Sequence, residues 1–423
     1  MPEAEVTAGS DAADGADGVG FEEFRARARG WLATEALRRG WVRPDDGRRR
    51  RGRSESDVAR AKECQRLLFE NGFAGISWPV EYGGQGLGIR EQIAFNVESL
   101  AYDLPLGMYI IGLGMCGPTI LAVGTEEQKR RYIPPMLSGE DVWCQLFSEP
   151  GAGSDVAGLS TRAVLDGDEW VVNGQKIWTS GAHNSDFGIL IARTDPDVPK
   201  HRGITMFILD LRSPGVTLRP IRQIDGGAHF NEVFFDDVRI PAVNVLGDVN
   251  RGWQAATTTL ANERVSLGAV RAMDDVPSAR ELIDRARQLG RTTDPVLRQD
   301  LMRVWIAERT VGLLGDRITS AILRGAVPGP EGSVAKLVRT DHARLSASLG
   351  AAMAGAGATA WAPGEPGADL WARMLLYVPS LSIAGGTDEV LRNIVGERVL
   401  GLPKEPQVDR DVPFRELAKG GLR

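Results

Sequence analysis

The sequence predicts an α+β protein of several domains, arranged in the order helical, β, helical. Three observations predict it. Apolar residues recur at helical spacing from Phe21 to about Trp143, short apolar stretches alternate with turn residues from Gln145 to about Val249, and helical spacing returns from Gly252 to Leu400. Steps of three and four residues are typical of helices, and short apolar stretches bounded by turn residues are typical of strands.

The N-terminal helical domain is expected to span residues 21–144. Phe21, Phe24, Ala28 and Trp31 mark its first helix, and a second helix is predicted over Ser56–Phe69. Residues 1–20 are acidic and rich in small residues, with no apolar core. We therefore expect a disordered tail there, and no signal peptide.

The central domain, residues 145–250, is expected to be a small β-barrel or sandwich. Trp170–Val172 leads into Asn173-Gly174, a pair that favours the tight turn of a hairpin. The last strand is expected to end before Asp236. Further strands are predicted, in chain order, at 187–192, 204–209 and 232–235.

The C-terminal helical domain is expected over residues 251–403, followed by a tail at 404–423. Glycine- and proline-rich loops interrupt the helical pattern at 328–332 and 363–367. Both residue types disfavour helix, so we expect separate helices on either side of each loop.

Composition excludes several classes of function. The 423 residues carry a net charge of −6, which argues against a nucleic-acid binder. The three cysteines are widely spaced and the four histidines are scattered, so neither a disulfide framework nor a metal site is expected. No apolar run approaches the ~20 residues of a membrane span. We expect a cytoplasmic protein with no membrane partner.

The densest motif is the segment Ser148-Glu149-Pro150-Gly151-Ala152-Gly153-Ser154-Asp155. Gly151 and Gly153 allow the backbone to approach a ligand closely, and Ser148 and Ser154 add hydroxyls beside main-chain N–H groups. A glycine-rich turn by itself is weak evidence, because an ordinary β-turn has the same composition.

Other segments agree with a binding site. Lys176-Ile177-Trp178-Thr179-Ser180 places an aromatic plane beside two hydroxyls, and Ala384-Gly385-Gly386-Thr387-Asp388-Glu389 forms a second glycine-containing loop. With these motifs in this order, the chain from Phe21 to Pro403 resembles the acyl-CoA dehydrogenase family. The resemblance implies three domains, the last a four-helix bundle, and an enzyme that oxidises an acyl-CoA thioester with FAD.

The resemblance also implies which residues hold the ligands. Trp178 would cover one face of the flavin ring, with Thr179 and Ser180 at its edge. Ser154, Arg264, Gly385 and Gly386 would contact the substrate. The full set implied to contact FAD is Gln145, Leu146, Phe147, Ser148, Gly153, Ser154, Trp178, Thr179, Ser180, Thr387 and Glu389.

The catalytic base is predicted at Glu263. Many family members carry a glutamate in the late loop where this chain has Gly385, so an active enzyme needs a carboxylate elsewhere. Glu263 follows Leu260 at the spacing of the apolar stripe on the predicted helix, as in isovaleryl- and long-chain-type members. The base would remove the α-proton while the β-hydrogen leaves as hydride to flavin N5, which gives the trans-2-enoyl thioester. The alternative is a glutamate tied to an internal arginine or to a backbone group.

In the family, two motifs on the C-terminal helices contact the FAD of a neighbouring subunit, and this chain departs from both, at 286–290 and 351–357. Arg285 or Arg287 could substitute for the arginine of the first motif. The chain is thus expected to form a homotetramer or homodimer, or a heterotetramer with a related chain.

Electron-transfer flavoprotein is the expected electron acceptor. The alternatives are an oxygen-using relative, namely an oxidase or monooxygenase, or a catalytically silent partner subunit. The acyl group is expected to be branched, long or bulky, on CoA or on a carrier protein.

Overall fold

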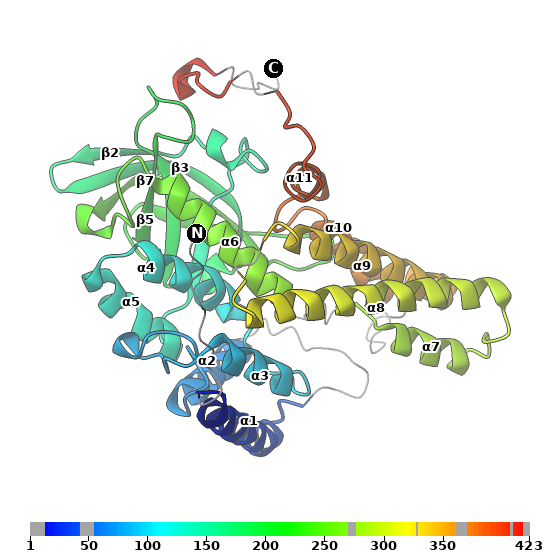
Figure 1. Ribbon diagram of the computed structural model, residues 1–423. Helices are drawn as coiled ribbons and strands as arrows, with labels where there is room; N and C mark the ends of the chain where they lie inside the picture. Colours follow the sequence, from blue (N-terminus) through cyan, green and yellow to red (C-terminus); the bar gives the residue numbers. More distant parts are fainter. Residues whose placement is uncertain are drawn as a thin grey trace, which may run out of the picture. The chain divides into compact units, whose positions relative to one another are not determined.

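The structure is a computed structural model that describes residues 13–42, 55–269, 276–326, 329–360, 362, 370–406 and 409–417 (Figure 1). The chain forms two compact units, Met1–Leu106 and Gly107–Arg423. No helix in the described ranges is both long enough and apolar enough to cross a membrane.

The first unit is helical, as predicted. It contains α1 (Ala13–Arg38), α2 (Glu55–Glu70), the 3₁₀ turn η1 (Val80–Tyr82) and α3 (Ile89–Ser99). Phe73 stacks on Phe95 at 5.2 Å and meets Phe24 edge-on at 6.0 Å, which builds an aromatic core between α1 and α3. Helix α1 begins at Ala13, inside the stretch expected as a tail.

In the division into compact units, residues 107–144 fall within the second unit. They form η2 (Gly107–Tyr109), the π-helical turn η3 (Gly112–Cys116), α4 (Gly117–Val123) and α5 (Glu126–Ser138). Thr119 on α4 shares a 2.9 Å hydroxyl contact with Thr259, and the Gln128 amide on α5 donates to the carbonyls of Val243 and Val245. These polar contacts join α4 to α6 and α5 to the turn that follows β7.

The centre of the second unit is one seven-stranded sheet with the order β1-β4-β2-β3-β7-β6, and β5 pairs with β4. Its inner face buries Leu146, Leu190, Phe207 and Phe235 in one apolar cluster. The strands are β1 (Trp143–Leu146), β2 (Arg162–Asp166), β3 (Glu169–Ser180), β4 (Phe187–Arg193), β5 (Ile204–Asp210), β6 (Val216–Ile221) and β7 (Phe230–Pro241).

The hairpin predicted at Asn173-Gly174 is wrong, because both residues lie inside β3 at a bulge. Gly174 has a φ of 148°, and a Cβ there would lie 2.7 Å from the Thr161 backbone. The tight turn lies earlier, at Gly167-Asp168 between β2 and β3. The Asn-Gly pair therefore marks a bulge, and the two-residue turn is made by Gly-Asp.

Strand β7 also continues past the predicted stop at Asp236, as far as Pro241. Asp237 has a φ of 49° at the bulge, where it exchanges two hydrogen bonds of 2.9 and 3.0 Å with the Asn173 side chain. Pro241 is tolerated because it is the last residue of the strand.

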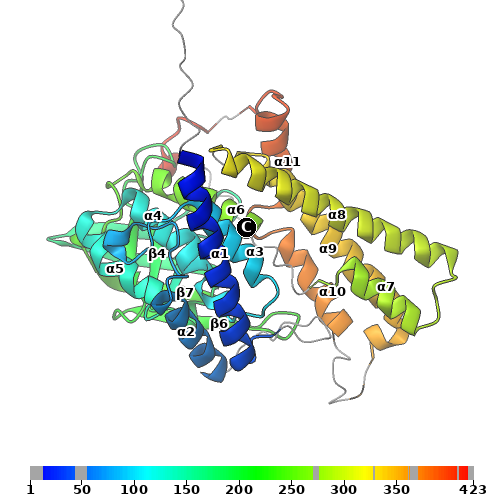
Figure 2. The ribbon, with the colours of Figure 1, turned by 60° about the horizontal axis from the view of Figure 1, so that its bottom comes forward.

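The C-terminal helices α7 to α10 pack as a bundle. Figures 1 and 2 show α8, α9 and α10 running side by side, with α7 against α8. Leu282, Leu301 and Leu349 fill the core between α7, α8 and α9. The helices are α6 (Gly252–Ala269), α7 (Ala279–Gln288), α8 (Pro295–Leu323), α9 (Gly332–Ala354), α10 (Leu370–Leu381) and α11 (Asp388–Ile394).

Part of the expected C-terminal tail is folded. Residues 409–417 contain the turn η9 (Phe414–Glu416), and the Phe414 N–H donates to the Val198 carbonyl at 2.9 Å. The Phe414 ring lies 3.9 Å from the Arg193 guanidinium. Backbone hydrogen bonds and this cation–π contact together hold a short segment that lacks helical or strand periodicity.

Candidate active site

The glycine-rich loop, residues 148–155, follows β1 and is closed by two 3.0 Å backbone hydrogen bonds between Glu149 and Ala152. Gly151 and Gly153 have negative φ values, and no atom lies within 4 Å of the Cβ that an alanine would add at either position. Neither the backbone nor the packing of this chain therefore requires glycine there. A Cβ at either position would project into open space.

A buried ion pair fixes this loop to β3. The Nζ of Lys176 lies 2.8 Å from the Glu149 carboxylate and donates to the Phe147 carbonyl at 2.9 Å. The same carboxylate accepts from the backbone N–H groups of Ser160 and Thr161. The sequence motifs contain both charged residues, but we assigned neither a role. Strand alternation from Trp170 and Val172 would have placed Lys176 on the inner face.

Burial alone would raise the pKa of Glu149, but the charge and hydrogen bond of Lys176 outweigh it and hold that pKa below its ordinary value. Burial lowers the pKa of Lys176 to about 8, and attraction to Glu149 opposes the shift. Both groups are therefore charged at neutral pH, so the loop is held by a desolvated ion pair.

Trp178 lies at the end of β3 in an unusual conformation. Its φ is 60°, and its side chain is 56% exposed while its edge contacts Phe230 at 5.9 Å. A large aromatic residue with positive φ is strained, and such strain is concentrated at functional sites. The strand has a register shift between Lys176 and Thr179, which turns the indole out of the sheet.

Next to this indole, the Thr179 hydroxyl is buried without a hydrogen-bond partner among the described residues. Buried hydroxyls almost always have a partner. The orphaned oxygen and the uncovered indole therefore indicate a flat ligand with polar edges. Of the other predicted contacts, Leu146 and Phe147 are buried, so only their backbone can face such a ligand.

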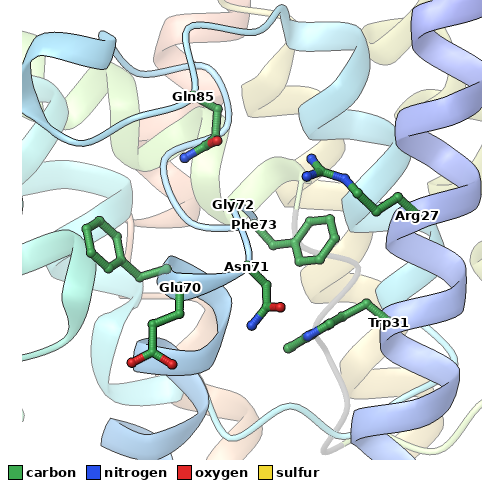
Figure 3. A pocket seen from close by; sticks show the side chains of 8 residues that line it. Arg27, Trp31, Glu70, Asn71, Gly72, Phe73 and Gln85 are labelled. Atoms are coloured by element: carbon green, nitrogen blue, oxygen red, sulfur yellow. The ribbon is translucent and has the colours of Figure 1, made fainter.

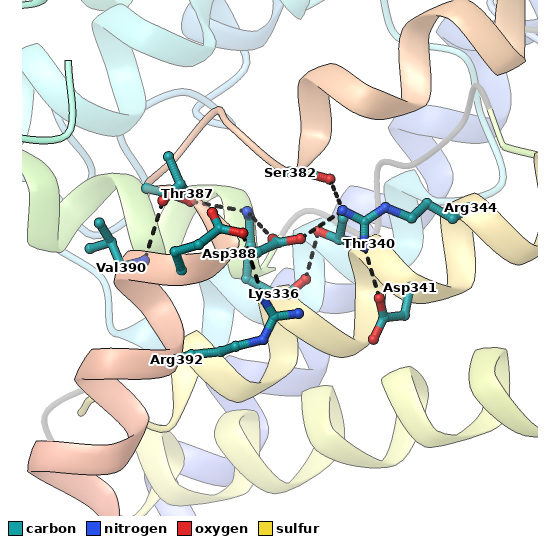
Figure 4. Close-up of polar contacts among 11 residues, drawn as sticks. Lys336, Thr340, Asp341, Arg344, Ser382, Thr387, Asp388, Val390 and Arg392 are labelled. Atoms are coloured by element: carbon teal, nitrogen blue, oxygen red, sulfur yellow. Dashed lines mark hydrogen bonds and ion pairs between the residues drawn. The ribbon is translucent and has the colours of Figure 1, made fainter.

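The second glycine-containing loop, residues 384–389, is held by ion pairs of Asp388 with α9 (Figure 4). This buried carboxylate pairs with Lys336 at 3.0 Å and with Arg344 at 2.9 Å. Lys336 also donates to the Gly386 carbonyl at 3.0 Å. Burial would raise the pKa of Asp388, but the two cations lower it below the ordinary value. Gly385 and Gly386 have φ values of 69° and 89°, a conformation that favours glycine.

Thr387 and Glu389 lie at the rim of a groove of about 500 Å³ between α9, α10 and this loop. The Thr387 hydroxyl caps α11 by accepting from the Val390 N–H at 3.2 Å. Glu389 is exposed and pairs with Arg392 at 3.6 Å. No hydrogen bond or ion pair within the described residues joins this loop to the glycine-rich loop.

The predicted base, Glu263, lies on helix α6. Gly252, Ala255, Ala256 and Thr259 form its buried face. Glu263 is one helical turn beyond Thr259 and Arg264 is next to it, but both side chains lie outside the described residues. A separate open pocket lies in the first unit, where Arg27 covers the ring of Phe73 (Figure 3), and it holds none of the predicted site residues.

Models of the acyl-CoA dehydrogenase N-terminal, middle and C-terminal domains match residues 22–140, 144–238 and 250–400. The chain belongs to the acyl-CoA dehydrogenase family. The acyl-CoA dehydrogenase IpdE1 of Mycobacterium tuberculosis is 39% identical over 91% of this chain and 98% of its own length. The resemblance stated from the motifs is confirmed, and the chain is an acyl-CoA dehydrogenase.

Solved structures agree with this assignment. The steroid acyl-CoA dehydrogenase Tcur3481-Tcur3483 matches at a TM-score of 0.75 and 32% identity, over 92% of this chain and 98% of the other. The ChsE4-ChsE5 complex of Mycobacterium tuberculosis matches at 0.73 and 30%, over 91% and 98%. The three-domain fold predicted for this acyl-CoA dehydrogenase is thereby confirmed.

Members of this family are FAD enzymes, and the residues of this acyl-CoA dehydrogenase fit the cofactor. An isoalloxazine has a flat face for the uncovered indole of Trp178 and polar edges for the partnerless hydroxyl of Thr179. Gly151 and Gly153 leave the room that a Cβ would fill.

Proposed function

We propose that this enzyme dehydrogenates a bulky acyl-CoA, with Glu263 as the base, and that Trp178, Thr179 and Ser180 hold the flavin beside the glycine-rich loop. The observation that carries this assignment is the exposed, strained indole next to a buried hydroxyl without a partner. FAD, when bound, supplies the acceptor for the hydrogen that leaves the β-carbon.

The position of Glu263 on α6 supports its role. The buried face of this helix passes through Ala256 and Thr259, and Glu263 follows Thr259 by one turn. Burial raises the pKa of a carboxylate toward the range that suits a base acting on an α-proton. The loop position that carries the base in many relatives is Gly385 here, so it offers no competing carboxylate.

Gly385 contributes its backbone N–H, which we assign to the thioester oxygen. Negative charge develops on that oxygen as the α-proton leaves, and a fixed donor stabilises it. The ion pairs of Asp388 with Lys336 and Arg344 hold the loop that carries this N–H. Gly386 extends the same substrate contact, and Arg264 and Ser154 are assigned to the CoA portion.

Anaerobic flavin bleaching tests the base. We expect Glu263→Gln to bind FAD as the parent does but to lose at least about 100-fold in the rate of bleaching by acyl-CoA. Asn262→Ala, one residue earlier on the same helix, is the matched control and should bleach at the parent rate. Bleaching by Glu263→Gln at the parent rate would refute the assignment.

The substrate is proposed to be a CoA thioester of a steroid-type side chain. The support is that a structural relative is named a steroid acyl-CoA dehydrogenase and that the base is assigned to the helix rather than the loop. A panel of isovaleryl-CoA, palmitoyl-CoA and a steroid-side-chain CoA would rank the classes by bleaching rate. Fastest bleaching by palmitoyl-CoA would contradict the steroid class, and reaction only with a carrier-bound acyl group would contradict CoA.

We also propose that a related chain completes the FAD site. Two structural relatives carry paired names, Tcur3481-Tcur3483 and ChsE4-ChsE5. In α7, Arg287 pairs with Asp284 at 2.6 Å and Arg285 bonds Gln288 at 3.4 Å, both within the exposed surface of the same helix. Full FAD occupancy after purification of this chain alone would contradict the proposal. Gain of flavin on co-expression with a related chain would support it.

Electron-transfer flavoprotein is the proposed acceptor. Oxygen consumption by the substrate-reduced enzyme tests this choice against the oxidase alternative. Slow reoxidation in air, together with fast reoxidation by electron-transfer flavoprotein, is the expected result.

A further inference from the structure

The C-terminal segment Asp409–Leu417 is bound to the loop that joins β4 and β5, residues 194–203. Phe414 donates its N–H to the Val198 carbonyl at 2.9 Å, and Arg415 donates to the Pro196 carbonyl at 3.0 Å. An ion pair between Arg415 and Asp197 adds to these contacts. The segment is therefore an integral part of this end of the sheet.

Lys200, in the middle of that loop, joins the C-terminal segment to the glycine-rich loop. Its Nζ lies 2.9 Å from a carboxylate oxygen of Asp155 and 2.9 Å from one of Asp409. An ammonium has three donors, so it can hold both carboxylates at once. The Lys200 side chain is largely covered, whereas both carboxylates are exposed. Asp155 is the residue directly after Ser154.

Arg193, at the end of β4, contacts the 194–203 loop, the backbone just after the glycine-rich loop and the C-terminal segment. Its guanidinium is buried and donates at 2.6 Å to the carbonyls of Ala157 and Lys200. Phe414 covers it at 3.9 Å. The C-terminal segment thus shields a desolvated cation that binds the backbone just after the glycine-rich loop.

The strand order explains why these loops meet. Strands β1 and β4 are parallel neighbours, with Leu146 opposite Leu190. The glycine-rich loop follows β1 and the 194–203 loop follows β4, so both leave the sheet at the same end. The 194–203 loop also reaches the start of α6, where His201 meets Trp253 edge-on at 4.9 Å.

We propose that Lys200 is a positioning residue for Ser154, and that Asp409–Leu417 acts as a strap that keeps Lys200 and Arg193 in place. The strap makes residues far beyond the last bundle helix part of the ligand site. The effect on ligands rests on the proposed function, since Ser154 is assigned there to the CoA portion of the substrate.

The test compares Lys200→Met, Lys200→Arg and Asp409→Asn in the full chain, in whichever assembly carries FAD. Hydrogen–deuterium exchange of the peptide covering residues 148–158 is measured first. We expect faster exchange in Lys200→Met and Asp409→Asn and parent-like exchange in Lys200→Arg, because arginine restores a cation. With the acyl-CoA that bleaches the flavin fastest, KM should rise about two- to fivefold in the first two variants, while kcat changes less than twofold.

Arg239→Met is the matched control. Arg239 also bridges two carboxylates, Asp166 and Glu169, but at the β2–β3 hairpin. The Arg239→Met variant should leave both the exchange of residues 148–158 and the KM unchanged. Parent-like exchange of that peptide in Lys200→Met and Asp409→Asn would overturn the strap, whatever the activity. Faster exchange with unchanged KM and unchanged FAD affinity would instead overturn the positioning of Ser154.

Discussion

The Glu149 carboxylate lies 2.8 Å from the Nζ of Lys176, and both side chains are buried. This pair joins two segments that the chain shares with acyl-CoA dehydrogenases, the glycine-rich loop and the end of β3. Backbone donors at Ser160 and Thr161 complete the coordination of the carboxylate. The ion pair therefore holds the glycine-rich loop against the sheet.

Lys176→Met should destabilise the protein strongly. It leaves Glu149 buried without its cation, and breaking a buried pair in this way costs about 3–5 kcal/mol. The double variant Glu149→Gln with Lys176→Met removes both charges and should lose less than the single variant. Urea unfolding measures the free energy of unfolding of the parent, the single variant and the double variant. A single-variant loss below about 1 kcal/mol, the scale of a surface pair, would contradict the importance of the pair.

Thr179→Val should affect stability and cofactor binding in opposite directions. The Thr179 hydroxyl is buried with no partner among the described residues. Replacing the hydroxyl by a methyl should thus not destabilise the cofactor-free protein. It should leave the free energy of unfolding equal to that of the parent or raise it, by about 1–3 kcal/mol at most. If the hydroxyl bonds FAD, its loss should weaken FAD binding about fivefold. Urea unfolding and fluorescence titration with FAD measure the two effects.

Thr161→Val is the control for this pair of measurements. Thr161 is equally buried, but its hydroxyl donates to the Gln175 carbonyl at 3.3 Å. Its loss should lower stability, unlike the loss at Thr179. Equal destabilisation by the two variants would mean that the Thr179 hydroxyl has a partner in the free protein.

Much of the fold could be predicted because each element carries its own pattern. The predicted helix over Ser56–Phe69 and the strands over Phe187–Ala192 and Ile204–Leu209 agree with α2, β4 and β5 to within a residue. The errors occur where a local signal has two physical solutions. Asn173-Gly174 favours positive φ, and both a hairpin turn and a bulge use it. In the structure Gly174 lies at a bulge of β3, packed so closely against Thr161 that only glycine fits.

The candidate site could be predicted in part for a similar reason. Gly385, Gly386 and Thr387 stand together in the sequence, so a motif could point to them. The groups that hold them come from elsewhere, since Asp388 pairs with Lys336 and Arg344 on α9, about fifty positions earlier in the chain. Such long-range pairs leave no spacing pattern, and the contact of Lys200 with Asp409 is hidden for the same reason.

Gly151→Ala and Gly153→Ala should leave the fold intact and weaken ligand binding. The added Cβ meets no atom within 4 Å at either position, so the free energy of unfolding should change by less than about 1 kcal/mol. FAD or acyl-CoA affinity should fall, because the methyl enters the space assigned to them. Gly174→Ala is the contrasting control, since its Cβ would clash with Thr161 and should destabilise the chain. Unchanged affinities in both variants would remove the glycine-rich loop from the site.

Asp388→Asn should remove a pH-dependent part of the stability. The pKa of Asp388 is lower in the folded chain than in the unfolded one, so its ion pairs stabilise the fold above the ordinary pKa of an aspartate and lose that effect as pH falls. At pH 7 the variant should be about 1.5–3 kcal/mol less stable, because the buried carboxylate loses its charge-assisted bonds while Lys336 and Arg344 stay partly solvated. Urea unfolding from pH 7 to pH 3 should show this difference shrinking, since a protonated carboxyl resembles an amide. A difference that stays constant would show that Asp388 does not titrate with the fold. Asp341→Asn, which removes a more exposed partner of Arg344, should change stability by less than about 1 kcal/mol across the same range.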